Sequence, residues 1–537
     1  MLRIFGNTFT APMSGTLPPT MIAVLRRWWE PALFLVLTGL HLLPVHAGRW
    51  FVTLDGPCHL YSARLLKALW EGDAFIGGFF RVNLWPDPYW LGHLLMVPLY
   101  GMLPAWALER LLYSLAVAGL ALSFRWFIGV LAPERRWMSL AVMPFLLHYA
   151  LRLGFLNFSL SLPLLLVALA LGVRTMNDAG RSWRPLAVVL ALLYFAHLTS
   201  LLVACALLLA VACWRSLIGE GPIGLRIKGA LSWWPALVLP TALTMLYVIR
   251  QPDPSGVARH LPLAELWNAL LQGRSWNALW AGGEEEASQW TALPLLLGGV
   301  LAAVWGLGDA LRKGARTIPF WSVAWMPALA AYLLLPDTMA GGSSASPRLL
   351  LFLMLLMAVA LATSALPRWI AGLLLACTLA ADLHHTRIHY LSALSLSQEA
   401  DEFLGVAAGM EDGTTLLSLN YSSNWMHSNL PNYLGVHEAR VVVLDHFTAL
   451  APFNPVQWRP ERLPYHAIGD FAESGRPCVR MNGYEAVTGV PVHAVVTWKM
   501  GTDIADSCAV DVRRQLGSGY KMRSSGAHGD AVLYELK

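Results

Sequence analysis

The chain has 537 residues, of which 56% are hydrophobic and 13% are charged, and its formal net charge is +5. An ordinary soluble domain is roughly 45–50% apolar and 25% charged, so this composition excludes a soluble globular protein. The net charge is too small to indicate a nucleic-acid partner, whereas the 24 tryptophans and 33 prolines are typical of a polytopic membrane protein.

The first part of the chain consists of apolar runs with short basic loops. Residues 1–20 are weakly apolar and interrupted by glycine and proline, and Arg26-Arg27 precede the first apolar run, so we expect no cleavable signal peptide and a cytoplasmic tail over residues 1–28. A membrane span needs about 20 mostly apolar residues. Residues 29–383 contain about eleven candidate spans: 29–47, 109–131, 137–151, 155–173, 185–198, 200–214, 231–249, 291–308, 319–335, 349–365 and 367–382. The run 89–108 contains His93, Pro98 and Pro104 and is interpreted as a pair of interfacial helices.

The basic residues decide the predicted orientation, because Lys and Arg are enriched in short cytoplasmic loops. With residues 1–28 inside and 89–108 not crossing, four basic clusters fall on the cytoplasmic side: Arg125 with Arg135 and Arg136, Arg174 with Arg181 and Arg184, Arg215 with Arg226 and Lys228, and Arg312 with Lys313 and Arg316. An odd number of spans then places the C-terminal part outside. Short loops between compact spans are typical of the inner (plasma) membrane of a bacterium, which is the expected location.

The last part of the chain, residues 384–537, has a different composition, with 16 acidic and 12 basic residues. Its alternating pattern predicts a soluble extracytoplasmic α/β domain, with strands at 415–419, 441–444, 494–498 and 531–536 and a helix near 506–516. Cys478 and Cys508 are the two cysteines of this part, and they could pair in an oxidising compartment. The sequence leaves that pairing open, because it cannot test the geometry.

The first outside loop, residues 48–108, is long and opens with Asp55-Gly56-Pro57-Cys58-His59-Leu60. Residues 59–70 carry apolar side chains at helical spacing and are expected to lie on the membrane surface. His59 would share a face with Asp55 in a helix, but Pro57 favours a turn. Long loops without secondary structure are uncommon unless they have a function, so this loop is predicted to carry catalytic residues.

This layout resembles the GT-C superfamily of integral-membrane glycosyltransferases, which includes oligosaccharyltransferases and transferases that use polyprenyl-phosphate sugars. The resemblance covers the whole chain as architecture: a first span, an outside loop with an acidic residue, surface helices, further spans and a C-terminal domain. Its sequence part is short. It consists of Asp55 with His59, the span entry Gly154-Phe155-Leu156-Asn157-Phe158, Arg348, and the strand-like ends at 495–498 and 531–534.

The resemblance implies transfer of a sugar from a polyprenyl-phosphate donor to an envelope glycan, lipid or protein, with the lipid-linked donor and membrane lipids as partners. Such an enzyme needs a base for the acceptor and a cation for the departing phosphate. The candidate catalytic residues are Asp55 and His59, and the candidate phosphate ligands are Arg348 and Arg152. His148, His197 and Asp337 are expected to line the cavity. If a divalent ion such as Mg²⁺ or Mn²⁺ takes part, Asp55 would be its ligand.

Each of these residues also has an ordinary structural interpretation. Asp55 could be a solvated loop residue or a helix cap, and Arg348 could anchor its helix at the interface by snorkelling. Glu284-Glu285-Glu286 is interpreted as a solvated charge run. The segment 148–153 lacks the second acidic residue that better-known GT-C members often carry there. The alternatives are therefore a non-catalytic membrane scaffold, or a transporter, although mid-span charges are nearly absent.

Overall fold

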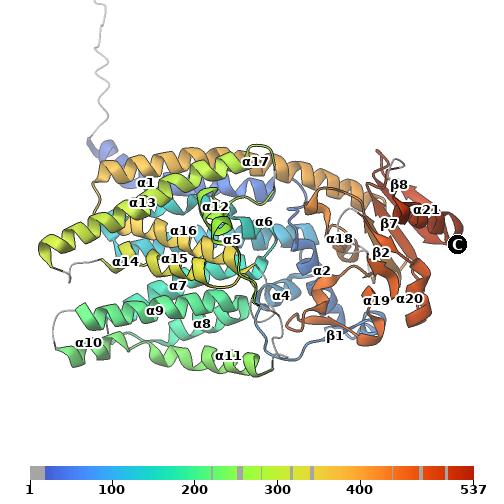
Figure 1. The fold of residues 1–537 in the computed structure, drawn as a ribbon, viewed down its shortest axis with the longest axis horizontal. Coiled ribbons are helices and arrows are strands. Elements are labelled where there is room, and N and C mark those ends of the chain that lie inside the picture. Colours follow the sequence, from blue (N-terminus) through green and yellow to red (C-terminus); the bar gives the residue numbers. More distant parts are fainter. Residues whose placement is uncertain are drawn as a thin grey trace, which may run out of the picture.

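The computed structural model describes residues 19–178, 180–218, 222–250, 258–279, 281–314, 319–338, 344–437, 440–470, 476–501 and 506–537. The molecule is elongated, with a helical bundle at one end and a sheet at the other (Figure 1). One long helix, α17 (Arg368–Gly405), runs along the bundle and continues to the sheet. Elements α2 and α4, which belong to the expected first outside loop 48–108, lie at the junction between the two ends.

The bundle is built from the apolar runs. Its other elements are α1 (Pro19–Leu42), α5 (Ala105–Leu131), η3 (Pro133–Leu147), α6 (Tyr149–Arg152), α7 (Leu156–Asn177), α8 (Arg184–Ala196), α9 (Leu198–Ile218), α10 (Ile223–Ala230), η4 (Trp234–Leu237), α11 (Val238–Arg250), α12 (Leu263–Leu271), α13 (Glu284–Lys313), α14 (Phe320–Val323), α15 (Trp325–Leu334) and α16 (Ala345–Thr363). Helix α16 lies in the core, where most of its side chains are buried.

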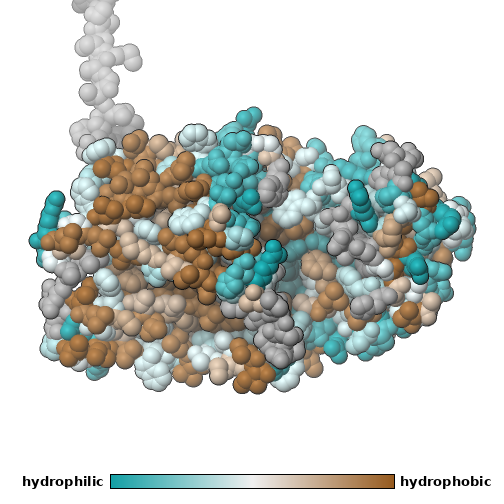
Figure 2. Space-filling view, viewed as in Figure 1, coloured by the Kyte–Doolittle hydropathy of each residue, from teal (hydrophilic) through white to brown (hydrophobic). Residues whose placement is uncertain are grey.

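Six helical segments within the described residues are long and apolar enough to cross a membrane: Ala105–Leu131, Leu156–Asn177, Leu198–Ile218, Arg226–Arg250, Glu284–Lys313 and Ala345–Thr363. Apolar side chains cover much of the bundle's visible surface, whereas the sheet end is mostly polar (Figure 2). The chain is therefore a multi-pass membrane protein. The expected count of about eleven spans is not confirmed. The run expected at 185–198 gives a shorter apolar helix, as does the one at 319–335, and 137–151 falls mainly on the 3₁₀ helix η3.

The segment 89–108 contains the short helices α4 (Leu91–Met96) and η2 (Val97–Leu99) before α5 begins at Ala105. The segment 59–70 belongs to α2 (Gly56–Trp70), whose side chains Leu60, Leu65 and Leu66 are buried in the protein. They are covered because α2 packs against α4 and against α18 (Asn432–His437) of the C-terminal part. The expectation that this apolar face rests on the membrane surface is therefore wrong.

The C-terminal part contains a five-stranded sheet in the order β3-β2-β7-β9-β8. The strands are β2 (Thr415–Asn420), β3 (Val442–Val443), β7 (Ala494–Trp498), β8 (Tyr520–Ser525) and β9 (Ala531–Leu536). Strand β2 pairs parallel with β3 and β7, while β9 pairs antiparallel with β7 and β8. The four segments expected as strands are strands, and β8 was missed because its alternation is weak and most of its residues are exposed.

The C-terminal part also contains shorter strands and helices, and one of these strands pairs with the first loop. Strand β1 (Phe80–Val82) of that loop pairs antiparallel with β4 (Val456–Trp458). The short strands β5 (Gly469–Asp470) and β6 (Cys478–Val479) pair with each other, and the helices α19 (Tyr465–Ile468), α20 (Met481–Thr488) and α21 (Ser507–Gly519) lie around the sheet. The first loop and the C-terminal part thus form one packed unit around α2.

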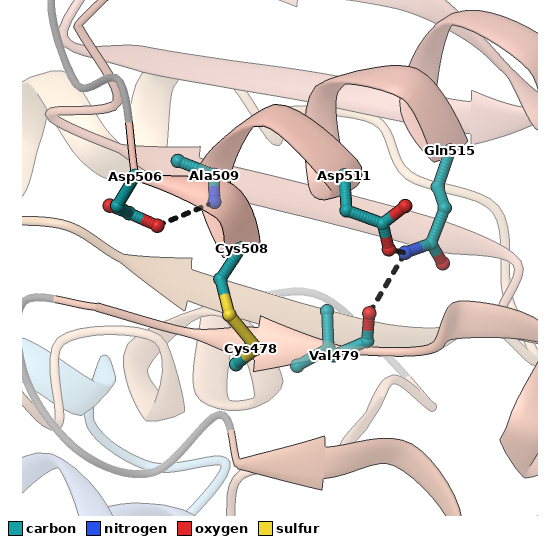
Figure 3. Close-up of a disulfide and its surroundings, with 7 residues drawn as sticks. All are labelled: Cys478, Val479, Asp506, Cys508, Ala509, Asp511 and Gln515. Carbon is teal, nitrogen blue, oxygen red and sulfur yellow. Dashed lines mark hydrogen bonds between the residues drawn. A yellow bond between two sulfur atoms is a disulfide. The ribbon is translucent and has the colours of Figure 1, made fainter.

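Cys478 and Cys508 form a disulfide that ties β6 to the first turn of α21 (Figure 3). Beside it, the Gln515 side chain donates a hydrogen bond to the Val479 carbonyl at 2.8 Å. The bridge closes a loop with a sequence separation of 30 residues. A cross-link of that span stabilises a folded chain by about 3–4 kcal/mol, because it restricts the unfolded state.

We expect Cys508→Ser to lower the melting temperature of the detergent-solubilised protein, with Cys213→Ser as the control because Cys213 is an exposed free cysteine. Thiol labelling with and without reductant should reveal two additional reactive cysteines after reduction of the wild type, since one bridge releases two thiols. Equal labelling under both conditions would contradict the disulfide.

Candidate functional site

Asp55 stands at the start of α2, and the backbone around it is held by residues 152–154, which run from the end of α6 toward α7. Its N–H donates a hydrogen bond to the Leu153 carbonyl at 3.0 Å. Gly154 has φ +76°, and a Cβ there would lie 2.4 Å from the Gly56 nitrogen, so only glycine permits this approach. The expected turn after Asp55 is instead the first turn of a helix, because proline is tolerated in that turn.

The Asp55 carboxylate lies at a partly buried position between the bundle and the C-terminal part. Its Oδ1 accepts a hydrogen bond from Asn429 Nδ2 at 3.1 Å. Burial raises the pKa of Asp55 to about 7, and the charge of Arg348 opposes that rise. A carboxyl group with a pKa near neutrality can take a proton and release it again, which is the property required of a general base.

Arg348 lies in the first turn of α16 and is the centre of the polar group around Asp55. Its charge acts on Asp55 and His197, and also on Tyr89 and Tyr149. These groups come from separate parts of the chain. The fold therefore gathers one guanidinium and one carboxylate with aromatic and imidazole groups around them.

The span entry Gly154-Phe155-Leu156-Asn157-Phe158 has a structural role in this site. The Arg348 guanidinium lies 5.0 Å from the Phe155 ring centre and 5.9 Å from that of Phe158, which holds the cation by cation–π attraction. Asn157 donates a hydrogen bond to the Tyr89 carbonyl at 2.6 Å. Tyr89 has φ +72°, a strained conformation for a residue with a side chain, and Asn157 maintains it.

His197 and His148 occupy buried positions beside the same aromatic residues. The His197 ring lies 5.0 Å from the rings of both Tyr89 and Phe158. The His148 ring lies 6.3 Å from that of Phe158, and its Nδ1 accepts a hydrogen bond from the Leu151 N–H as the cap of α6. His197 thus lies beside the residues around Arg348. His148 also fixes the backbone of α6, which precedes the span entry 154–158.

Asp337 contacts the backbone at the start of α16, near Arg348. Its Oδ1 accepts a hydrogen bond from the Ser346 N–H at 3.0 Å, two residues before Arg348. A carboxylate that accepts from the first N–H groups of a helix fixes where the helix begins. Asp337 therefore positions the turn that carries Arg348.

His59 and Arg152 lie in other groups. The His59 ring lies 5.3 Å from that of His93, and burial lowers the pKa of His59 to about 4, so this imidazole is neutral at pH 7. Arg152 is fully buried, and its guanidinium lies 4.7 Å from the Phe51 ring centre. The charge that acts most strongly on Arg152 is that of Glu284.

The sequence interpretation missed Asp445, which directly follows the predicted strand at 441–444. Asp445 is buried, and burial raises its pKa to about 7. Its charge and that of Asp55 both act on the Cys58 thiol of α2. One signal was present: the carboxyl end of a parallel strand is where α/β sheets place functional side chains. Asn429, by contrast, had no signal in the sequence that would link it to Asp55.

Comparisons with known proteins give matches among solved structures, whereas no family model and no curated protein matches the chain. One match is ArnT from Cupriavidus metallidurans bound to undecaprenyl phosphate, with 16% identity, coverage of 96% of this chain and 98% of that one, and a TM-score of 0.40. Another is the apo oligosaccharyltransferase of Archaeoglobus fulgidus, with 14% identity, coverage of 96% and 75%, and a TM-score of 0.46.

Proposed function

We propose that this chain is a GT-C-type glycosyltransferase that moves a sugar from a polyprenyl-phosphate donor to an envelope glycan, lipid or protein. The observation that supports the proposal is the electrostatic interaction between Asp55 and Arg348. A carboxyl group whose pKa burial raises to about 7 interacts with the charge of a guanidinium, at the start of α2 between bundle and sheet (Figure 1). Transfer from a lipid phosphate needs these two groups in one place.

The reaction follows from the chemistry of the two side chains. The Asp55 carboxylate takes the proton of the acceptor hydroxyl as its oxygen attacks the anomeric carbon of the donor sugar. The bond between that carbon and the phosphate oxygen breaks, and the electron pair leaves with the polyprenyl phosphate. Arg348 binds the charge that develops there, because a guanidinium donates two parallel hydrogen bonds to phosphate oxygens. Phe155 and Phe158 keep the guanidinium in position.

A divalent ion at this site would depend on Asp55 alone among the acidic residues named for it. Mg²⁺ is commonly held by one or two carboxylates together with substrate phosphates, so Asp55 would be its ligand from this chain. Such an ion would supply further positive charge to the phosphate. The steps given above require only Asp55 and Arg348.

The same proposal includes the placement in the membrane. Residues 1–28 would lie in the cytoplasm, and residues 384–537 would form the extracytoplasmic domain of a protein in a bacterial inner membrane. The clustering of basic residues in the loops at one end of the spans supports this orientation. A lipid-linked donor would reach Arg348 from the outer part of the bilayer, since Arg348 stands at one end of the apolar helix α16.

The test is transfer of labelled sugar by the purified protein in lipid nanodiscs, with a panel of polyprenyl-phosphate sugars as donors and envelope material as acceptor. We expect label in the acceptor with at least one donor and none with empty nanodiscs. Absence of transfer with every donor, from protein that is monodisperse and folded, would overturn the proposal and favour a membrane scaffold. Movement of the donor across the bilayer without transfer would favour a transporter.

A further inference from the structure

A second group of ionisable side chains is buried in the bundle, apart from Asp55 and Arg348. Glu284 is the first residue of α13, and His385 and His389 lie one turn apart on α17. All three are at most 1% exposed. The expectation that 284–286 is a solvated run is wrong for Glu284, although Glu285 and Glu286 are exposed. Burial of such groups in a membrane bundle is costly and requires a compensating interaction.

The ligand atoms of this triad converge on one point. One atom from each side chain lies within 4.8 Å of the other two. The Nε2 atoms of His385 and His389 are 3.1 Å apart, and His389 Nε2 is 3.5 Å from Glu284 Oε1. The Trp276 carbonyl oxygen lies 3.1 Å from His385 Nε2. Ligands on bonds of 2.0–2.1 Å in a tetrahedron are about 3.3 Å apart, and the His385–His389 and His389–Glu284 separations are close to that spacing.

Backbone N–H groups satisfy the Glu284 carboxylate, but hydrogen bonds leave the two imidazoles of the triad in conflict. A carbonyl oxygen only accepts, so the Trp276 contact requires a proton on His385 Nε2. His389 Nε2 must then be unprotonated to face His385, and its lone pair also points toward the Glu284 carboxylate. A cation at the common point would turn these opposed lone pairs into ligands.

We propose that Glu284, His385 and His389 bind a divalent transition-metal ion, and that the natural ion is zinc. Two imidazole nitrogens and one carboxylate oxygen are a common zinc ligand set, and the Trp276 carbonyl or a water would complete the shell. The site is structural: it fastens the start of α13 to α17 inside the bundle. This site is separate from the proposed transfer chemistry and does not depend on it.

Neighbouring groups brace the proposed ligands. Glu284 accepts hydrogen bonds from the N–H groups of Ala278 and Leu279 at 2.9 Å, which fixes the carboxylate. Partners of this kind orient metal ligands in proteins. Asp382, one turn before His385, is hydrogen-bonded to His41 at 2.9 Å, so this second buried carboxylate has its own partner and lies outside the triad. Arg152 is the competing partner of Glu284, because its buried guanidinium also responds to that charge.

The test is the metal content of the purified protein, measured by mass spectrometry after purification without a histidine tag. We expect about one zinc ion per chain in the wild type, and less than about a tenth of that in Glu284→Gln and His385→Gln. Glu285→Gln and His384→Gln are the matched controls, because these neighbours are exposed, and both should retain the metal.

A second measurement uses the wild type alone, so that a variant that fails to fold does not decide the outcome. After removal of metal with a chelator, added Co²⁺ should give the visible absorption of a tetrahedral site, and added Zn²⁺ should raise the melting temperature. Wild-type protein without bound metal, without a Co²⁺ spectrum and without a stability change would overturn the proposal. Glu284 would then serve to hold the backbone N–H groups of residues 278, 279 and 281 and to neutralise Arg152. Neither readout involves sugar transfer, so the proposed function is tested independently.

Discussion

Replacing Asp55 with Asn is expected to lower the rate of sugar transfer by about 10²–10⁴-fold, the range that a general base contributes. Asparagine has nearly the same size as aspartate, and its oxygen can still accept the hydrogen bond from Asn429. It cannot take the proton of the acceptor. The KM for the donor should change little, because Arg348 and its aromatic supports remain.

The pH profile of the wild type provides an independent check. Because burial raises the pKa of Asp55 to about 7, the carboxyl is protonated below that pH and cannot act as the base. The transfer rate should fall about tenfold per pH unit below 7 and level off above it. Glu71→Gln is the control, since Glu71 belongs to the same loop and its side chain is 58% exposed. Full activity of Asp55→Asn with an unchanged profile would remove Asp55 from the mechanism.

Replacing Arg348 with Ala is expected to reduce transfer by about 10²-fold, because two charge-assisted hydrogen bonds to phosphate are together worth about 3 kcal/mol. The loss should appear in kcat as well as in the KM for the donor, since the phosphate charge grows as the bond breaks. Arg348→Lys should recover part of the binding but little of kcat, because an ammonium group lacks the planar fork.

Arg259→Ala is the matched control for Arg348. Arg259 is exposed and lies close to the same part of the fold, since its carbonyl accepts a hydrogen bond from the Asp337 N–H at 2.8 Å. The measurement is steady-state transfer in nanodiscs with the donor concentration varied. If Arg348→Ala and Arg259→Ala behave alike, Arg348 anchors its helix and does not bind the donor.

The sequence singled out Asp55 and Arg348 as candidates because charged residues are scarce in this chain and both stand near the ends of apolar runs, and the structure places them where their charges interact. The sequence also located the strands of the sheet, since alternating apolar residues in a polar region have few other interpretations. Composition made the membrane character clear for the same reason: an 18-residue apolar run has little use in a soluble protein.

Long-range contacts could not be predicted in the same way. Glu284 and Glu285 are the same residue type in one acidic run. The packing of α13 against α17 buries Glu284 and leaves Glu285 exposed, and the sequence does not show that packing. The apolar face of α2 gave the pattern of a membrane-surface helix, because periodicity does not tell whether lipid or protein covers it. The contact between Asn429 and Asp55 joins residues 374 positions apart.

The continuous helix α17 also limits how the molecule can move. Its 38 residues span about 57 Å at a rise of 1.5 Å per residue. The domain boundary expected between residues 383 and 384 falls inside this helix. The helix carries His385 and His389 in the bundle. Further along it carries Glu399, whose carboxylate lies 2.8 Å from His427 Nε2 in the C-terminal part. No flexible linker therefore separates bundle from sheet at that point, and truncation there would cut a helix. A swing of the sheet about a hinge at residues 383–384 would therefore have to break this helix.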